Sequence, residues 1–197
     1  MKTNHQKINS LALTAILAAL TALLSFVNLP MFGLELTFTM VPVAVGAVLY
    51  GKTTGLILGS VFGLISFWQC LGYSPFGAAL FAINPFYTFL TCVPTRMLAG
   101  FLAGTLADAT RKKPRISCLV GSLCAPLFNT LFFMTVLILS FYRTDYIQAI
   151  SQGFHTANPL VFAVMFVGLN GLIELLCGAF LAYPVSRAVS TAIAPRK

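Results

Sequence analysis

Six long apolar stretches, separated by short polar connections, are the feature that most limits what this chain can fold into. The stretches cover residues 11–29, 38–50, 53–71, 84–107, 115–141 and 159–187. A helix needs about 20 apolar residues to cross a bilayer, and most of the stretches approach or exceed that length. Because 58% of the 197 residues are hydrophobic and only 8% are charged, a soluble fold would expose large apolar patches and aggregate. We therefore predict an all-α fold, a single integral membrane domain over residues 1–197 with six transmembrane helices.

The connections carry the residues that break or begin helices. Segment 30–37 is expected to be a loop or a re-entrant segment, Gly51 and Lys52 a tight turn, and segments 72–82, 108–114 and 142–157 loops. Asn84-Pro85 and Asn158-Pro159 are predicted helix starts, because proline is favoured in a first helical turn, where its missing N–H costs little.

The placement of the basic residues predicts the orientation in the membrane. With a cytoplasmic N-terminus, the inner segments carry ten of the twelve basic residues: Lys2, Lys7, Lys52, Arg111, Lys112, Lys113, Arg115, Arg187, Arg196 and Lys197. The outer loops then carry only Arg143, and Arg96 lies inside a helix. Such an excess of Lys and Arg on one side predicts that both termini are cytoplasmic. It also explains the net charge of +8 without a nucleic-acid partner.

A few polar residues lie deep inside the apolar stretches. Arg96 is about 12 residues into the fourth stretch, roughly 18 Å along a helix. Glu174 and Asn129 lie near the middle of the sixth and fifth stretches, and Asn170 lies one turn from Glu174. A lone charge at this depth costs several kcal/mol, so we expect these groups to face the bundle interior.

Two interpretations of this polar set stay open. Arg96 and Glu174 could form a structural salt bridge, or the set could line a ligand site, and the two are compatible. Nearer the outer side, Gln69 and Asn84 are candidates for the mouth of such a site.

Patterns typical of enzymes are missing or carry no chemistry. The sequence contains no catalytic motif and only four acidic residues, and its five cysteines form no Cys-x-x-Cys pair. Residues 46–53 match the G-x-x-x-x-G-K-T pattern of a phosphate-binding loop. That loop must follow a strand in a nucleotide-binding domain, whereas this one ends an apolar stretch. We predict that the chain is not an enzyme and binds neither a metal nor a cofactor.

Small residues at intervals of four mark two helix faces. Gly55, Gly59 and Gly63 predict close helix packing in the third stretch. Ala15 and Ala19 form a similar face in the first stretch. That alanine face could pack within the bundle or dock onto a partner subunit.

Taken together, the order of these features is similar to that of a known family. The features are the alanine-rich first stretch, residues 39–47, the glycine-spaced third stretch, Val93-Pro94-Thr95-Arg96 with Gly100 and Gly104, and Asn170 with Glu174 before Tyr183-Pro184-Val185. The chain resembles the substrate-binding S components of energy-coupling factor (ECF) transporters, above all the riboflavin and pantothenate types. It departs from the family at Lys52, where proline is more usual.

The resemblance implies a function and partners. An S component in the bacterial plasma membrane captures a water-soluble vitamin from outside and docks on an ECF membrane scaffold subunit that is coupled to two ATPases. Ala15 and Ala19 would meet the scaffold, segment 30–37 would form a lid, and Asn129 and Asn170 would line the pocket. An Arg96 facing the cavity would suit a carboxylate such as pantothenate, whereas Arg96 paired with Glu174 would suit an uncharged ligand such as a flavin. A stand-alone secondary transporter or channel, and a membrane structural or assembly protein, are the alternatives.

Overall fold

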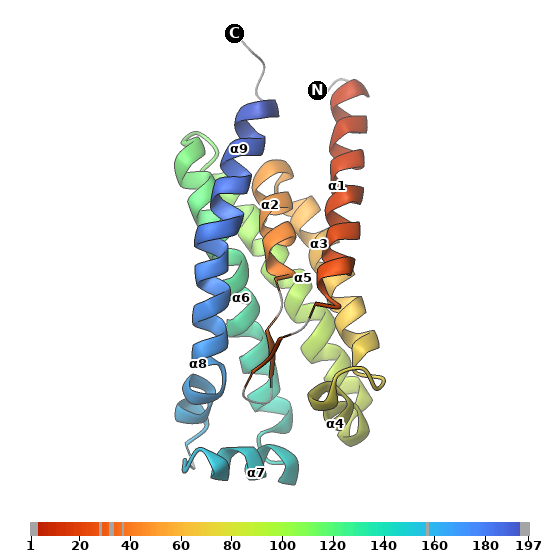
Figure 1. Ribbon diagram of the computed structural model, residues 1–197, viewed down its shortest axis with the longest axis vertical. Helices are drawn as coiled ribbons and strands as arrows, with labels where there is room; N and C mark the ends of the chain where they lie inside the picture. The colour runs from red at the N-terminus through yellow and green to blue at the C-terminus, as the bar shows by residue number, and fades with distance from the viewer. Residues whose placement is uncertain (1–3, 28, 32–33, 37, 157, 194–197) are drawn as a thin grey trace.

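The protein is a bundle of helices with a small β-hairpin, seen in a computed structural model that describes residues 4–27, 29–31, 34–36, 38–156 and 158–193 (Figure 1). For residues 4–7, 29–31, 34–36, 169–170 and 193 the description covers the backbone alone. The long elements are α1 (Asn4–Leu24), α2 (Met40–Tyr50), α3 (Lys52–Gln69), α5 (Pro85–Ala109), α6 (Pro114–Phe141) and α8 (Pro159–Cys177). Helix α8 continues through a π-helical turn, η1 (Gly178–Ala182), into α9 (Tyr183–Ile193). The predicted helical bundle is confirmed.

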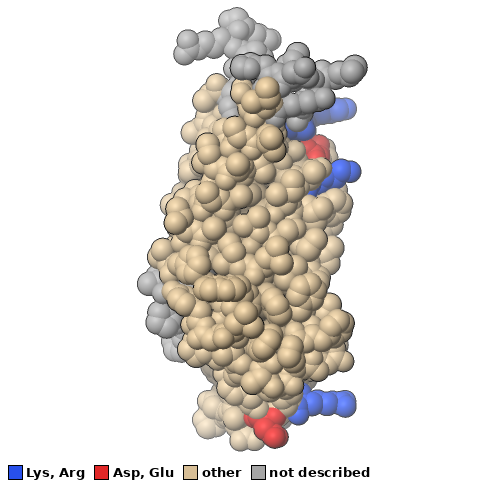
Figure 2. Space-filling model, turned by 90° about the vertical axis from the view of Figure 1, so that its right-hand side faces the viewer, with Lys and Arg blue, Asp and Glu red and all other residues tan. Residues whose placement is uncertain are grey.

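Both ends of the described chain lie at the same end of the bundle (Figure 1), as an even number of membrane crossings requires. On the face drawn in Figure 2, charged side chains gather at the two ends and the length between them is uncharged. Within the described residues, Pro85–Ala109, Pro114–Phe141 and Gly171–Ala192 are long and apolar enough to cross a membrane by length and composition. The number of crossings and the side that faces the cytoplasm stay predictions.

Several predictions about the helix ends and the connections were wrong. The first helix ends at Leu24 rather than at residue 29, and a hairpin of β1 (Leu29–Met31) and β2 (Leu34–Leu36) follows it. The expected loops 72–82 and 142–157 contain two short helices, α4 (Pro75–Ile83) and α7 (Asp145–Gly153). Helix α4 starts with a proline behind a serine whose side chain accepts a hydrogen bond from Gly77 N–H, a standard N-cap.

Helices α3 and α5 pack backbone to backbone through the predicted glycine face. A methyl group added at Gly55 would run into the carbonyl of Gly100. One added at Gly59 would meet the carbonyl of Arg96 in the same way. The spacing of four residues therefore brings the two backbones into direct contact, as small-residue motifs do in membrane helices. The contact also fixes the depth and direction of Arg96 on α5.

Replacing Gly59 with alanine should destabilise the bundle, because the new methyl group must push α3 away from α5. Overpacking of this kind costs about 1–3 kcal/mol, and we expect a lower unfolding temperature of the purified protein in detergent. Gly168→Ala is the matched control, since a methyl group there meets only Val164 Cγ1 at 4.0 Å. Equal unfolding temperatures for the two variants would show that the α3–α5 contact is not tight.

The segment that matches a phosphate-binding loop is a helix–turn–helix corner. Gly51, at φ +83°, makes the turn between α2 and α3. The Lys52 N–H at the start of α3 donates to the carboxylate of Asp108 (3.1 Å), which in turn forms an ion pair with Arg111 (3.2 Å). Because an acidic side chain of this protein already caps the helix, the corner is not built to receive a phosphate.

Two apolar clusters form most of the core of the bundle. One centres on Val43, Leu58 and Ala99, from α2, α3 and α5. The other includes Phe141 and Phe162, and joins α4, α6, α7 and α8 at the opposite end of the bundle. The buried polar residues described next lie among α3, α4, α5, α6 and α8.

Candidate functional site

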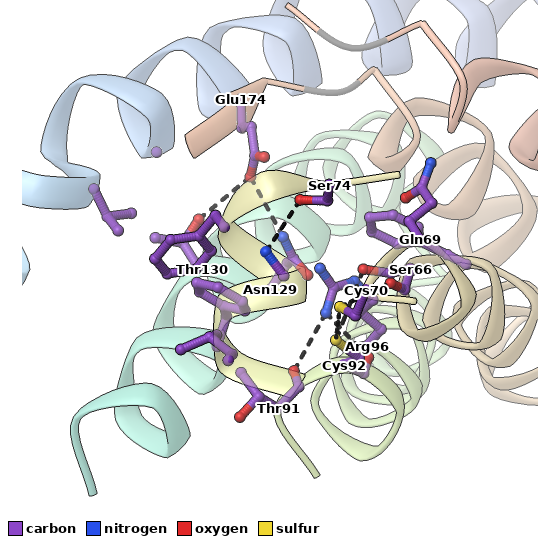
Figure 3. A pocket seen from close by; sticks show the side chains of 17 residues that line it. Ser66, Gln69, Cys70, Ser74, Thr91, Cys92, Arg96, Asn129, Thr130 and Glu174 are labelled. Atoms are coloured by element: carbon purple, nitrogen blue, oxygen red, sulfur yellow. Dashed lines mark hydrogen bonds between the residues drawn. The ribbon is translucent and has the colours of Figure 1, made fainter. Parts of the chain in front are cut away.

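A cavity of about 120 Å³ is lined by residues of α3, α4, α5, α6 and α8. Phe62, Phe76 and Phe133 give it an apolar surface. Set into that surface are charged and polar residues (Figure 3), among them Gln69, Thr91, Arg96, Asn129, Thr130 and Glu174. An apolar cavity with a few convergent polar groups is typical of a small-molecule site.

Arg96 supplies the positive charge of this cavity. It lies just after Pro94, in the middle of α5. Its Nη1 donates to the carbonyls of Thr91 (3.2 Å) and Cys92 (3.0 Å), and its guanidinium carbon lies 4.6 Å from the centre of the Phe62 ring. These contacts hold the guanidinium in place without neutralising it.

The Arg96–Glu174 salt bridge, one of the two interpretations of the polar set, is not formed. Within the described part of the chain, the ion pair present is that of Arg111 with Asp108. Glu174 instead accepts from Asn129 Nδ2 and Thr130 Oγ1, both at 3.4 Å. In Figure 3 the Glu174 and Arg96 side chains come from different walls, with Asn129 drawn between them. Both charges therefore face the cavity separately.

Two buried polar atoms at this cavity lack hydrogen-bond partners among the described residues. They are Arg96 Nε, a donor, and Asn129 Oδ1, an acceptor. The two side chains are only 9% and 8% exposed. An unsatisfied buried polar group costs about 1–3 kcal/mol, so a ligand that offers both an acceptor and a donor would recover this energy.

The remaining predicted site residues have different positions. Gln69 lines the cavity, and its Nε2 donates to the carbonyl of Ser25 (2.6 Å), just beyond α1. Asn84 lies outside the lining and caps α5, where its side chain accepts from Tyr87 N–H (3.1 Å). Asn170 belongs to α8, but its side chain lies outside the described residues. Whether these residues bind a ligand stays a prediction.

The arrangement is suited to binding a small molecule. Among the described residues there is no group of three or more His, Cys, Asp or Glu side chains that could hold a metal ion. The fixed cation and the Glu174–Asn129–Thr130 group could together hold a small polar molecule with an anionic end.

Comparison with known proteins decides the family. Residues 9–186 match the model of the family described as "ECF transporter, substrate-specific component". This chain belongs to that family. The S component is also 24% identical to the pantothenate transporter PanT of Leuconostoc mesenteroides subsp. mesenteroides. The aligned 165 residues cover 80% of this chain and 76% of PanT. The protein is therefore a substrate-binding subunit for vitamin uptake in a membrane, and not an enzyme.

The alanine face of α1 points away from the S component's own bundle. Ala15 and Ala19 are exposed, whereas Ala18 packs against the core. The large neighbours Ile16 and Leu23 are 64% and 68% exposed. Of the two interpretations of this face, packing within the bundle is wrong.

Sequence reasoning missed several residues of the cavity wall. Ser66, Cys70, Thr91, Cys92 and Thr130 all line it. Thr130 directly follows Asn129, and Thr91 precedes Arg96 by little more than one helical turn, so proximity to the predicted residues was the available signal. The two cysteines were given no role, because the five cysteines form no Cys-x-x-Cys pair.

Proposed function

We propose that this S component captures pantothenate, or a closely similar small carboxylate, in the cavity around Arg96. The observation that carries the proposal is a buried guanidinium with no carboxylate within ion-pair distance among the described residues. A buried cation is costly unless it is paired. The carboxylate of the ligand would supply the missing partner, in a charge-assisted hydrogen bond with the free Nε–H.

The wall opposite Arg96 suits the part of pantothenate that lies away from its carboxylate. Pantothenate carries hydroxyl groups and an amide at the end away from its carboxylate. Glu174 and the unpartnered Asn129 Oδ1 accept hydrogen bonds, and Thr130 can both donate and accept. Because Glu174 would repel a second carboxylate, it favours a ligand orientation with the anionic end at Arg96.

A flavin is the weaker candidate. A neutral ligand was expected only if Arg96 and Glu174 neutralised each other, and their separation in the cavity argues against it.

Delivery is proposed to need partners. The exposed Ala15–Ala19 face supports docking of α1 on an ECF transmembrane scaffold subunit, with two ATPase subunits providing the energy. The hairpin of β1 and β2 follows α1 and would close over the captured vitamin as a lid. The S component would cross a bacterial plasma membrane six times, with both termini cytoplasmic.

The purified S component alone should bind pantothenate and not riboflavin. Calorimetry measures the affinity, and the fluorescence of Trp68, the single tryptophan, gives a second readout. Trp68 contacts Phe26 edge to face with the ring centres 6.0 Å apart, so movement of the segment after α1 should change its emission. Binding of riboflavin with no binding of pantothenate would reverse the substrate assignment. Uptake by the lone protein in liposomes would instead favour a stand-alone transporter.

A further inference from the structure

Two cysteine thiols meet in the wall of the cavity. Cys70 follows α3 directly and Cys92 lies on α5, and their sulfur atoms are 3.7 Å apart. Both side chains are 5% exposed, and both line the cavity (Figure 3). Although both cysteines belong to a buried apolar cluster with Val93, they also line the cavity, so a small reagent that enters the cavity reaches them.

The surrounding contacts hold the two sulfur atoms together. Gly63 of α3 leaves room for the backbone of α5 at Cys92 and Val93. On the other side, Gly77 of α4 lies against the Cys70 side chain. These contacts keep the two side chains next to each other, so the thiols can approach by side-chain rotation together with a small adjustment of the backbone.

We propose that Cys70 and Cys92 form a dithiol modification site that small thiol oxidants convert to a disulfide. The sulfur atoms need to close from 3.7 Å to about 2 Å. With a low-molecular-weight disulfide as oxidant, the thiolate of one cysteine attacks it and releases one small thiol. The second cysteine then attacks the mixed disulfide and releases the other. Two protein thiols are oxidised, and one small disulfide is reduced to two thiols.

The new bond would act on the substrate site through two contacts. The carbonyl of Cys92 accepts a hydrogen bond from Arg96 Nη1 (3.0 Å). Cys70 follows Gln69, whose side chain holds the carbonyl of Ser25. Pulling the two cysteines together therefore shifts a support of the guanidinium and the connection to the segment after α1.

Oxidation of the purified protein tests the site without any vitamin. After treatment with 2-hydroxyethyl disulfide or diamide, two of the five cysteines should resist alkylation under denaturing conditions. The intact mass should fall by two hydrogen atoms. Trypsin leaves both cysteines in one peptide, because residues 53–95 contain no Lys or Arg, so a chymotryptic digest is needed to show the link.

Single variants decide which thiols react. Cys92→Ser and Cys70→Ser should each prevent the loss of two thiols, whereas Cys124→Ser, on α6 outside this cavity, should not. Retention of all five thiols by the folded wild-type protein, or the loss of two thiols in Cys92→Ser, would overturn the proposal. Mapping of the wild-type link keeps the test valid if a variant fails to fold.

A second readout, protection of the dithiol by pantothenate, rests on the proposed function and is measured separately from the oxidation test. Saturating pantothenate should slow the oxidation, because it would occupy the route to the dithiol. A disulfide that forms at the same rate with and without pantothenate would count against the position of the vitamin and leave the dithiol site standing.

Discussion

Arg96→Gln should lower the affinity for pantothenate about 100-fold. Removing one partner of a buried, hydrogen-bonded charge pair costs 2–5 kcal/mol, and about 3 kcal/mol corresponds to a factor of about 100. Glutamine keeps much of the length and polarity of the side chain but loses the charge and the unpartnered Nε–H. Calorimetry on the purified protein measures the change, and unfolding temperatures show whether the variant is folded.

A neutral analogue separates recognition of the carboxylate from general damage to the cavity. Panthenol carries a hydroxyl group in place of the carboxylate, so wild-type protein should bind it weakly and Arg96→Gln should hardly change that affinity. Arg143→Gln, which removes an exposed cation from the connection before α7, is the matched control and should bind pantothenate normally. If Arg96→Gln weakened panthenol and pantothenate equally, Arg96 would be a structural residue and not the carboxylate ligand.

The double substitution Ala15→Trp and Ala19→Trp should abolish uptake but preserve vitamin binding. Close helix contacts in membranes depend on small residues, and bulky insertions into a packed contact cost about 1–3 kcal/mol each. Two insertions should reduce transport by the full ECF complex more than tenfold. Transport of labelled pantothenate in cells measures the loss of uptake, and calorimetry on the isolated variant measures the preserved vitamin binding.

Leu139→Trp is the matched control for the docking face. Leu139 is 81% exposed on α6, so the substitution adds the same bulk to a different outer surface. We expect normal uptake and normal co-purification with the scaffold for this control. Equal loss of uptake in both proteins would mean that added bulk anywhere on the outer surface disturbs transport, and α1 would lose its proposed role.

The long helices were predictable because their signals are strong. The spacing of Gly55, Gly59 and Gly63 identified the α3–α5 contact, and the two Asn-Pro pairs located the first residues of α5 and α8. The short elements were not found. Helix α7 is only nine residues long, and its polar composition resembles that of a loop. Proline and glycine in segments 30–37 and 72–82 were interpreted as signs of irregular structure, although Pro75 begins α4.

The site was predictable only to the level of which residues lie at the same depth. Depth along each helix placed Arg96, Asn129 and Glu174 together, and all three line one cavity. Their partners depend on side-chain conformations, which no spacing specifies. Asn84 shows a related limit. An asparagine that caps a helix cannot be told from an asparagine that binds a ligand by its residue type alone, and Asn84 caps α5.

The π-helical turn η1 has a consequence for comparing members of the family. Helices α8 and α9 form one continuous rod, and the turn at Gly178–Ala182 accommodates an extra residue within it. Each residue of an α-helix advances the direction of the side chain by about 100°. A relative that lacks one residue here would keep Glu174 in place and still present a different side of α9 to α6. An alignment with such a relative should therefore place a single-residue gap at 178–182 before any residue of α9 is equated between the two proteins.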